Sequence, residues 1–206
     1  MIVRGKAFGT DFLGIFLANV EGKLIFHSTF PKRDFLERGA EALNLKLWEV
    51  GGETSLLGIF VSGNSKGGVS GIEIPGLRFL GTRYTALGNL IVANDKGALI
   101  APCLESVKRE IEKALGVKAR TGTVGGMEVV GSLVLANNKG ALVSPEASEE
   151  EIELIEKALK VDADYGTIAK SGFLGSMAVV SDEGALIPES ALAPEIAQLQ
   201  EVLEIE

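Results

Sequence analysis

The sequence is poor in several residue types that would mark a class of protein. Its 206 residues include one cysteine, Cys103, so no disulfide can form within the chain, which suits a reducing compartment. They include one histidine, His27, which is too few for a transition-metal site built from histidine and cysteine. The chain has no apolar run of about eighteen residues, and its N-terminus lacks the apolar core of a signal peptide. We therefore expect a cytoplasmic protein with no membrane span and no metal.

Basic side chains are also scarce. The chain has 20 Lys and Arg against 28 Asp and Glu, which gives a formal net charge of −8. General binding of nucleic acid needs clustered Lys and Arg that neutralise phosphates, and no such block occurs. An acidic surface attracts basic proteins instead. The glycine-rich segments at 51–52 and 122–126 are too short for a phosphate-binding loop and lack its Lys-Ser/Thr, so we expect no cofactor.

Glycine, by contrast, is abundant, and it marks an internal repeat. Residues 85–102 read TALGNLIVANDKGALIAP, and residues 128–145 repeat the phrase as EVVGSLVLANNKGALVSP. Aligned on its early glycine, the phrase occurs five times, at Gly14, Gly58, Gly88, Gly131 and Gly175. The second copy is short, because the second and third of these glycines lie closest together.

Each copy predicts the same order of elements. An apolar run meets a turn such as Asn-Asp-Lys-Gly at 94–97, and a second apolar run follows. This is the pattern of a tight hairpin in which Gly97 takes a positive φ. The first copy has a turn around Asn19 and Gly22 that reads as one residue shorter. Because the runs are apolar throughout, we expect strands that are covered on both faces.

An amphipathic helix and a short third strand follow the hairpin. The helices are expected to begin at Asp34, before Val107, at Ser148 and near Pro194 in the first, third, fourth and fifth copies. In the fourth copy Ser148 and Glu151 form a capping box. In the second copy the residues at 69–81 hold too much glycine and proline for a helix, so we expect a loop or strand there.

One such unit cannot bury both its sheet and its helix stripe, so its neighbours must supply the missing face. An open stack would need polar end caps, but the first and last copies are as apolar as the others. The sequence therefore predicts an α/β fold of five-fold pseudosymmetry, a closed propeller-like ring with strand-strand-helix-strand repeats and helices outside. Residues 1–206 form one domain, with repeats expected at 1–50, 51–81, 82–122, 123–166 and 167–206.

The phrase ALGN at 86–89, the following Asn-Asp at 94–95 and the preceding Arg83 resemble the archaeal translation initiation factor six family. The resemblance covers roughly 82–190 well and is looser before it. It implies the five-unit ring called the pentein fold and a role without catalysis. It also implies binding to the large ribosomal subunit, chiefly to a basic ribosomal protein near the sarcin–ricin loop, which blocks the small subunit. A monomer is the default for a closed ring.

The resemblance places a partner contact at Asn89, the residue after the glycine of ALGN. Arg83, Leu87, Ile59 and Asn64 are expected on the same side of the ring if the second and third copies are neighbours. The residues alone leave a second interpretation open, because asparagine at a strand entry commonly bonds to its own turn. Asn64 in particular reads as a turn former.

Two further function classes remain open at this point. Pentein rings also include enzymes that attack guanidino groups with a cysteine, a histidine and paired carboxylates. Cys103 lies at a predicted helix start, where a thiol pKa can fall, and His27 lies in a predicted strand. In those enzymes the cysteine comes near the end of the chain, and the fifth copy has none, so no catalytic residue is expected. A protein-binding scaffold outside the ribosome fits the acidic charge equally well.

Overall fold

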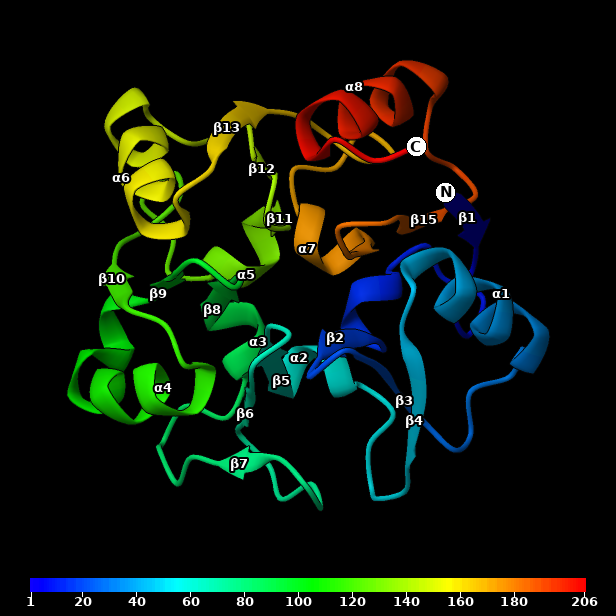
Figure 1. Cartoon of the computed structure of the whole chain (residues 1–206), viewed down its shortest axis with the longest axis horizontal. Coiled ribbons are helices and arrows are strands. Elements are labelled where there is room, and N and C mark those ends of the chain that lie inside the picture. Colours follow the sequence, from blue (N-terminus) through cyan, green and yellow to red (C-terminus); the bar gives the residue numbers. More distant parts are fainter.

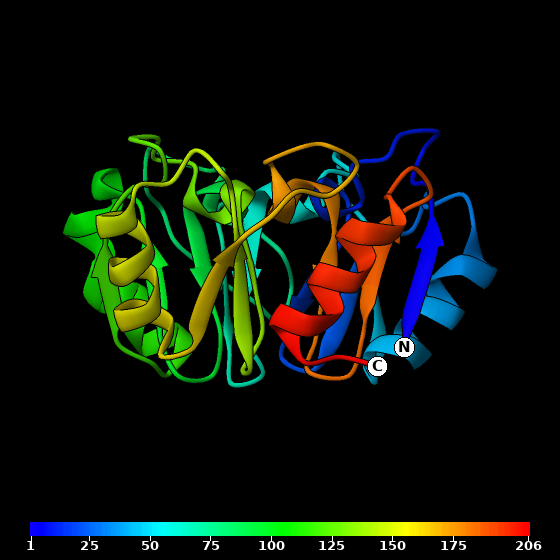
Figure 2. The same ribbon diagram turned by 90° about the horizontal axis from the view of Figure 1, so that it is seen from above.

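A computed structural model describes all residues, 1–206. It contains five three-stranded sheets, as the five copies predicted. Figure 1 shows these sheets around a central axis, with the long helices at the perimeter. Figure 2 shows the same molecule from its edge, with both chain ends at one side of the disc.

In every sheet the first two strands are antiparallel and the third is parallel to the middle one. The first sheet holds β2 (Ala18–Val20), β3 (Lys23–His27) and β4 (Lys46–Val50), and the second holds β5 (Val61–Gly63), β6 (Gly68–Ser70) and β7 (Arg78–Phe79). The third holds β8 (Ile91–Ala93), β9 (Ala98–Ile100) and β10 (Ala119–Thr121), and the fourth holds β11 (Val134–Ala136), β12 (Gly140–Val143) and β13 (Asp162–Tyr165). The fifth holds β14 (Val179–Val180), β15 (Ala185–Pro188) and β1 (Ile2–Gly5).

Four repeats carry a long outer helix, and the second repeat carries none, as the sequence predicted. The helices are α1 (Arg33–Leu43), α4 (Lys108–Leu115) after the 3-10 helix η2 (Pro102–Val107), α6 (Glu149–Leu159) and α8 (Ala193–Leu203). The capping box of Ser148 and Glu151 is present at the start of α6. Gly116, with φ of 65°, ends α4. Local signals in the sequence therefore set where these helices start and stop.

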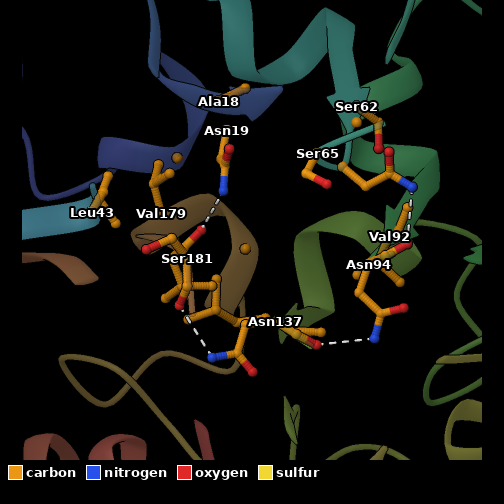
Figure 3. Close-up of a pocket in the computed structure, with 18 of the residues that line it drawn as sticks. Ala18, Asn19, Leu43, Ser62, Ser65, Val92, Asn94, Asn137, Val179 and Ser181 are labelled. Carbon is orange, nitrogen blue, oxygen red and sulfur yellow. Dashed lines mark hydrogen bonds between the residues drawn. The ribbon is translucent and has the colours of Figure 1, made fainter. Parts of the chain in front are cut away.

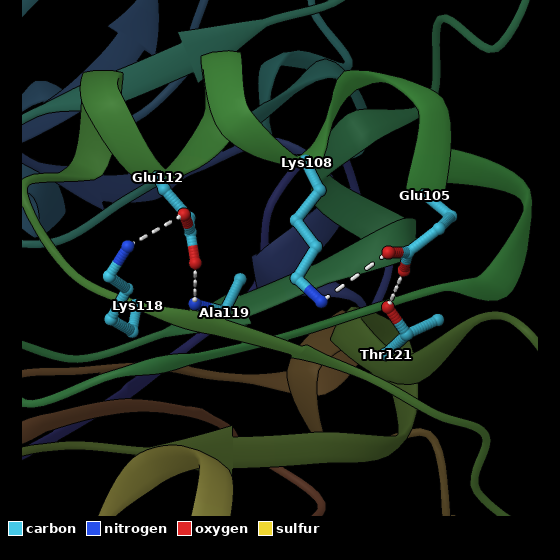
Figure 4. Close-up of polar contacts among 6 residues, drawn as sticks. All are labelled: Glu105, Lys108, Glu112, Lys118, Ala119 and Thr121. Carbon is cyan, nitrogen blue, oxygen red and sulfur yellow. Dashed lines mark hydrogen bonds and ion pairs between the residues drawn. The ribbon is translucent and has the colours of Figure 1, made fainter.

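Side-chain contacts attach the long helices of the third and fourth repeats to the third strand that follows each of them. Glu112 of α4 accepts hydrogen bonds from the backbone N–H of Ala119 (3.0 Å) and from Lys118 Nζ (3.3 Å), as Figure 4 shows. The backbone bond from Ala119 is the main reason that the pKa of Glu112 lies below its usual value. In the fourth repeat Glu156 accepts from the N–H of Ala163 (3.2 Å).

The N-terminal strand belongs to the fifth sheet rather than to the first. We expected residues 1–50 to supply the first repeat alone, but β1 pairs with β15, in register from Ile2 opposite Ala185 to Gly5 opposite Pro188. No strand follows α8, so the start of the chain takes the place of the missing third strand. The two ends of the sequence are thus joined within one sheet (Figure 1).

A short helical turn precedes the first strand of each repeat, which the sequence did not predict. These turns are η1 (Leu13–Ile15), α2 (Leu57–Phe60), α3 (Leu87–Leu90), α5 (Val130–Leu133) and α7 (Leu174–Met177). The repeat glycine lies inside each turn. A Cβ built on any of these five glycines would lie 1.8 to 2.1 Å from the main-chain oxygen of the repeat glycine in the adjacent unit. The contacts run through all five turns and return to the first, so they form a closed inner ring.

The turn glycines have a different role from the one that we expected. Gly97 does not adopt a positive φ. It is glycine because a Cβ there would lie 1.8 Å from the main-chain oxygen of Ala158, in the helix of the next repeat. The first turn is not shorter either, since Asn19 pairs with Leu24 as Ala93 pairs with Ala98.

The core shows how neighbours supply the missing face. One buried cluster combines Val92 and Leu99 of the third repeat with Val130, Ile155 and Leu159 of the fourth. Another joins Phe35 of the first repeat to Leu186 of the fifth. Apolar side chains of successive repeats are therefore buried against one another.

Candidate partner-binding faces

The disc has two faces of different chemistry. The hairpin turns at 20–23, 64–67, 94–97, 137–140 and 181–184 form one, which we call the turn face. The five short helical turns and the segments before them, at 7–10, 51–55, 82–85, 124–127 and 168–171, form the other, which we call the loop face. A cavity of about 360 Å³ lies between them on the axis, lined by residues of all five repeats (Figure 3).

Buried asparagines connect the repeats on the turn face. The side-chain oxygen of Asn94 accepts from the N–H groups of Lys96 and Gly97, both at 2.9 Å. Its amide donates to the carbonyls of Asn137 and Leu159 in the next repeat, both at 2.9 Å. Figure 3 shows the bond from Asn94 toward Asn137. The asparagines of this network thus form their own turn and also hold the neighbouring turn and helix end, a role that the sequence analysis missed.

Asn64 is a member of this network and not a surface residue near Asn89. It is 5% exposed, and its amide donates to the carbonyls of Asn94 (2.9 Å) and Leu115 (3.0 Å). It lies at the far end of β5 from Ile59, on the turn face. The expectation that Asn64 lies on the same side as Asn89 is therefore wrong, because the strand carries the chain from one face to the other.

The next residue of each turn forms a second set of bonds. The amide of Asn138 donates to Asp95 Oδ2 (2.9 Å) and Asp182 Oδ2 (2.7 Å), and Ser65 Oγ donates to Asp95 Oδ2 (2.8 Å). Partial burial works to raise the pKa of Asp95, but the hydrogen bonds from Ser65 and Asn138 hold it below its usual value. The polar groups at the centre of the turn face thus satisfy one another.

On the loop face, Asn89 and Ile59 lie in adjacent helical turns. Asn89 is in α3 rather than at a strand entry, and the backbones of α2 and α3 touch at Gly58 and Gly88. Both side chains are half-buried. The side chain of Asn89 makes no hydrogen bond to its own turn, so the turn-forming interpretation does not hold for it.

Arg83 and Leu87 have opposite surroundings. Arg83 is exposed, and its guanidinium lies over the ring of Tyr84, 4.7 Å from the centroid. Leu87 is 0% exposed and packs in the core with Leu80 and Ile91. Its side chain therefore cannot serve as the surface contact that we expected. Of the five expected contact residues, Arg83, Asn89 and Ile59 thus lie on the loop face with accessible side chains.

Two glutamates fix the loops of the fourth and fifth repeats. Glu195, at the third position of α8, accepts from Thr167 Oγ1 (2.7 Å) and from the N–H groups of Ala169 (2.8 Å), Lys170 (2.7 Å) and Leu192 (2.8 Å). Glu151 holds the loop at 124–127 in the same way. Burial works to raise both pKa values, but these bonds keep them below normal. Each glutamate follows a threonine that it binds, Thr123 before Glu151 and Thr167 before Glu195, and this recurring pair is the sequence signal that could have revealed the contact.

The structure does not assemble the residues of a guanidino-modifying enzyme. Partial burial and the Glu128 carboxylate raise the pKa of Cys103 to about 11, so its thiol is protonated at neutral pH. His27 lies in the first repeat, with its ring nitrogens bonded to Thr29 Oγ1 (2.7 Å) and the Gly52 carbonyl (3.2 Å). The second repeat separates it from Cys103.

Two other kinds of structural feature are absent from the protein. No group of three or more His, Cys, Asp or Glu side chains is placed to hold a metal ion. None of the helices combines the length and the apolar character needed to cross a membrane.

Comparison with known proteins gives a consistent result. The profile of the eIF-6 family matches residues 2–202. Translation initiation factor 6 of Pyrobaculum arsenaticum is 35% identical over 170 residues, which cover 74% of this chain and 75% of the relative. The protein of the same name from Methanocella arvoryzae is 33% identical over 143 residues, 63% of this chain and 64% of the relative. That of Pyrococcus abyssi is 41% identical over 73 residues, 35% of this chain and 32% of the relative. The chain therefore belongs to the eIF-6 family.

Proposed function

We propose that this protein is a translation initiation factor that binds the large ribosomal subunit and prevents its premature association with the small subunit. It acts in the cytoplasm as a monomer and without catalysis. Its five repeats form one closed domain, the pentein ring, and a rigid disc on the joining surface excludes the small subunit sterically. The family match over residues 2–202 carries this proposal.

The contact surface of the proposal is the Asn89 sector, which consists of Ile59, Arg83 and Asn89 on the loop face. Its polar groups are accessible, and the side chain of Asn89 has free hydrogen-bonding capacity. The turn face offers fewer free polar groups to a partner, since those at its centre are bonded to one another. A half-buried amide and an exposed arginine on the same face are suited to anchor a protein interface.

Charge around this sector suits a basic ribosomal protein. Glu53 is exposed in the loop-face segment at 51–55, and Glu128 and Glu146 are exposed beside the segment at 124–127. None of the three makes an ion pair within the chain. Opposite charges on the partner would speed association and orient the disc. Leu87, which is fully buried, contributes only by packing α3 against the core.

Sedimentation of ribosomal subunits tests the proposal. Purified protein is added to dissociated subunits under associating conditions, and the mixture is separated on a sucrose gradient. We expect the protein to migrate with the large subunit and to lower the peak of joined ribosomes. Migration with neither subunit would contradict the proposal.

An Asn89→Ser variant locates the contact. Removing the amide should weaken large-subunit binding about tenfold, as loss of one anchor commonly does. Its melting temperature should stay close to that of the parent, because the side chain is half-buried and bonds to nothing in its turn. Ser176→Ala, at the same position of the fifth repeat, is the matched control and should bind normally. Equal weakening of both variants would place the contact elsewhere.

A further inference from the structure

The loop face exposes a second surface, on the fifth and first repeats, away from the Asn89 sector. Phe12 is 43% exposed and Phe173 is 45% exposed, and each occupies the position just before its short helical turn. Leu192, just before α8, is 43% exposed. We call the surface formed by these three side chains and the neighbouring Lys6, Lys32 and Lys170 the aromatic sector.

Direct contacts connect the parts of this sector. The turns η1 and α7, which follow Phe12 and Phe173, touch through their repeat glycines. Asp11 Oδ2 accepts a hydrogen bond from Ser190 Oγ (2.8 Å), which brings the residue before Phe12 beside the segment that leads to Leu192. Glu195 accepts hydrogen bonds from the backbone N–H groups of both Leu192 and Lys170, which keeps these two residues close together. Figure 2 shows the loops at 7–10 and 168–171 on the same face of the disc.

The first repeat fixes its loop by aromatic packing rather than by a carboxylate. The third position of α1 is Phe35, where α6 and α8 have glutamate. Phe8 in the loop packs on Phe16 with ring centroids 4.8 Å apart and on Phe30 at 5.5 Å. Lys6 precedes this loop, and Lys32 follows Phe30 by two residues. The aromatic sector is therefore built on ordered elements.

Three lysines border this sector, and two carboxylates, Asp11 and Glu189, lie in its segments, of which Asp11 is bonded to Ser190 Oγ. Lys6, Lys32 and Lys170 have no carboxylate partner. Lys32 and Lys170 are exposed, and Lys6 is half-exposed. The chain as a whole carries a net charge of −8. An apolar patch bordered by unpaired lysines fits a ligand that combines apolar side chains with carboxylates.

We propose that the aromatic sector is a second docking site, which binds an acidic segment of a partner protein through apolar anchor residues. The anchors pack on Phe12, Phe173 and Leu192, and carboxylates of the segment pair with the three lysines. An aliphatic side chain in the patch favours protein over single-stranded RNA, since leucine offers no face on which a base can stack. The site is separate from the Asn89 sector and does not depend on binding to the ribosome.

Fluorescence anisotropy with a labelled peptide tests this site. The probe is a short fluorescein-labelled peptide in which aspartate alternates with leucine and phenylalanine. Three comparison probes are a peptide with lysine in place of aspartate, one with serine in place of the apolar residues, and a labelled oligouridylate. We expect binding of the first probe alone, weakened by added salt. Absence of binding, or equal binding of the lysine peptide, would overturn the proposal, and tighter binding of oligouridylate would assign the surface to RNA.

Variants place the binding on the molecule. The double substitution Phe12→Ser and Phe173→Ser should lower the affinity for the acidic peptide at least about tenfold. Phe79→Ser is the matched control, because Phe79 is 44% exposed but lies in β7 of the second repeat. This control should leave the affinity for the acidic peptide unchanged.

Backbone NMR of the parent protein gives an independent readout. On addition of the peptide we expect chemical-shift changes at 7–12, 168–173 and 190–192. Shifts confined to other segments would overturn the proposal. Because neither assay contains ribosomes, their failure leaves the anti-association proposal untouched.

Discussion

The second repeat differs from the other four in lacking a long outer helix, and the difference extends into the turn of the repeat before it. In the turns of the second to fifth repeats the last residue is Gly67, Gly97, Gly140 or Gly184. A Cβ at any of these would lie 1.8 to 2.4 Å from a carbonyl oxygen of the following repeat's helix. The turn of the first repeat faces the second, and there the same position is Lys23. The last residue of each turn is therefore glycine where a helix of the next repeat packs against it, and it is lysine where no such helix is present.

Other side chains take the place of the absent helix. Lys23 Nζ lies 4.5 Å from the centroid of the Trp48 ring. Gly76, with φ of 93°, brings the loop of the second repeat so close that a Cβ would lie 3.0 Å from the same ring. The asparagine that binds a helix end in later repeats is replaced by Val20, which is fully buried. Without a helix there are no helix-end carbonyls to bind, so an asparagine at this position would lack one of the two acceptors that Asn94 has.

The largest effect should come from adding a methyl group where a helix packs. Gly97→Ala places a Cβ 1.8 Å from the Ala158 oxygen, so α6 must move, and we expect a loss of about 3 kcal/mol in the free energy of unfolding. Lys23→Ala changes the equivalent position in the first repeat. It should lower the free energy of unfolding by about 1 kcal/mol or less, because it removes only the contact with the Trp48 ring. Urea unfolding of both variants measures the difference. Equal losses would break the comparison.

Exchanging the asparagine for the residue of the first repeat should have the next largest effect. Asn94→Val removes the bonds to Asn137 and Leu159 and leaves buried carbonyls unpaired, so we expect a loss of about 2 kcal/mol. The reverse change, Val20→Asn, should give no gain in stability, because no helix end lies beside it. Thermal or urea unfolding checks both. A stabilising Val20→Asn would contradict the role assigned to the helix.

The glutamate that holds the fifth loop should show a smaller effect that depends on pH. Its folded pKa lies below the usual 4.5, so its contribution is present above that value and is lost as the pH falls through the lowered pKa. Glu195→Gln should therefore cost about 1 kcal/mol at neutral pH and progressively less in acid. Unfolding of both proteins from neutral pH to about pH 3 gives the difference. A difference that does not change with pH would show that the charge of Glu195 is not what holds the loop.

Much of this fold could be predicted because its signals are local. The hairpins and the helices around Ser148 and Pro194 were found from apolar periodicity and capping residues, which need only neighbouring positions. The short helical turns escaped because four residues are too few for a period. The pairing of β1 with β15 and the packing at Gly97 also escaped, because both depend on contacts between distant parts of the chain.

The candidate site could be predicted only in part for the same reason. The resemblance to the family singled out Asn89 and Arg83, which are accessible. It could not separate them from Leu87 and Asn64, which are buried. Burial of Asn64 depends on carbonyls of the third repeat, and no pattern within its own turn reports them.

Hydrogen–deuterium exchange of the protein bound to the large subunit tests the central claim most directly. That claim is that the loop face makes the contact while the turn face holds the ring together. We predict added protection on binding at residues 82–90 and 56–60, with exchange at 94–97 and 137–140 unchanged. Protection of the turn face, with the loop face exchanging as in the free protein, would contradict the account.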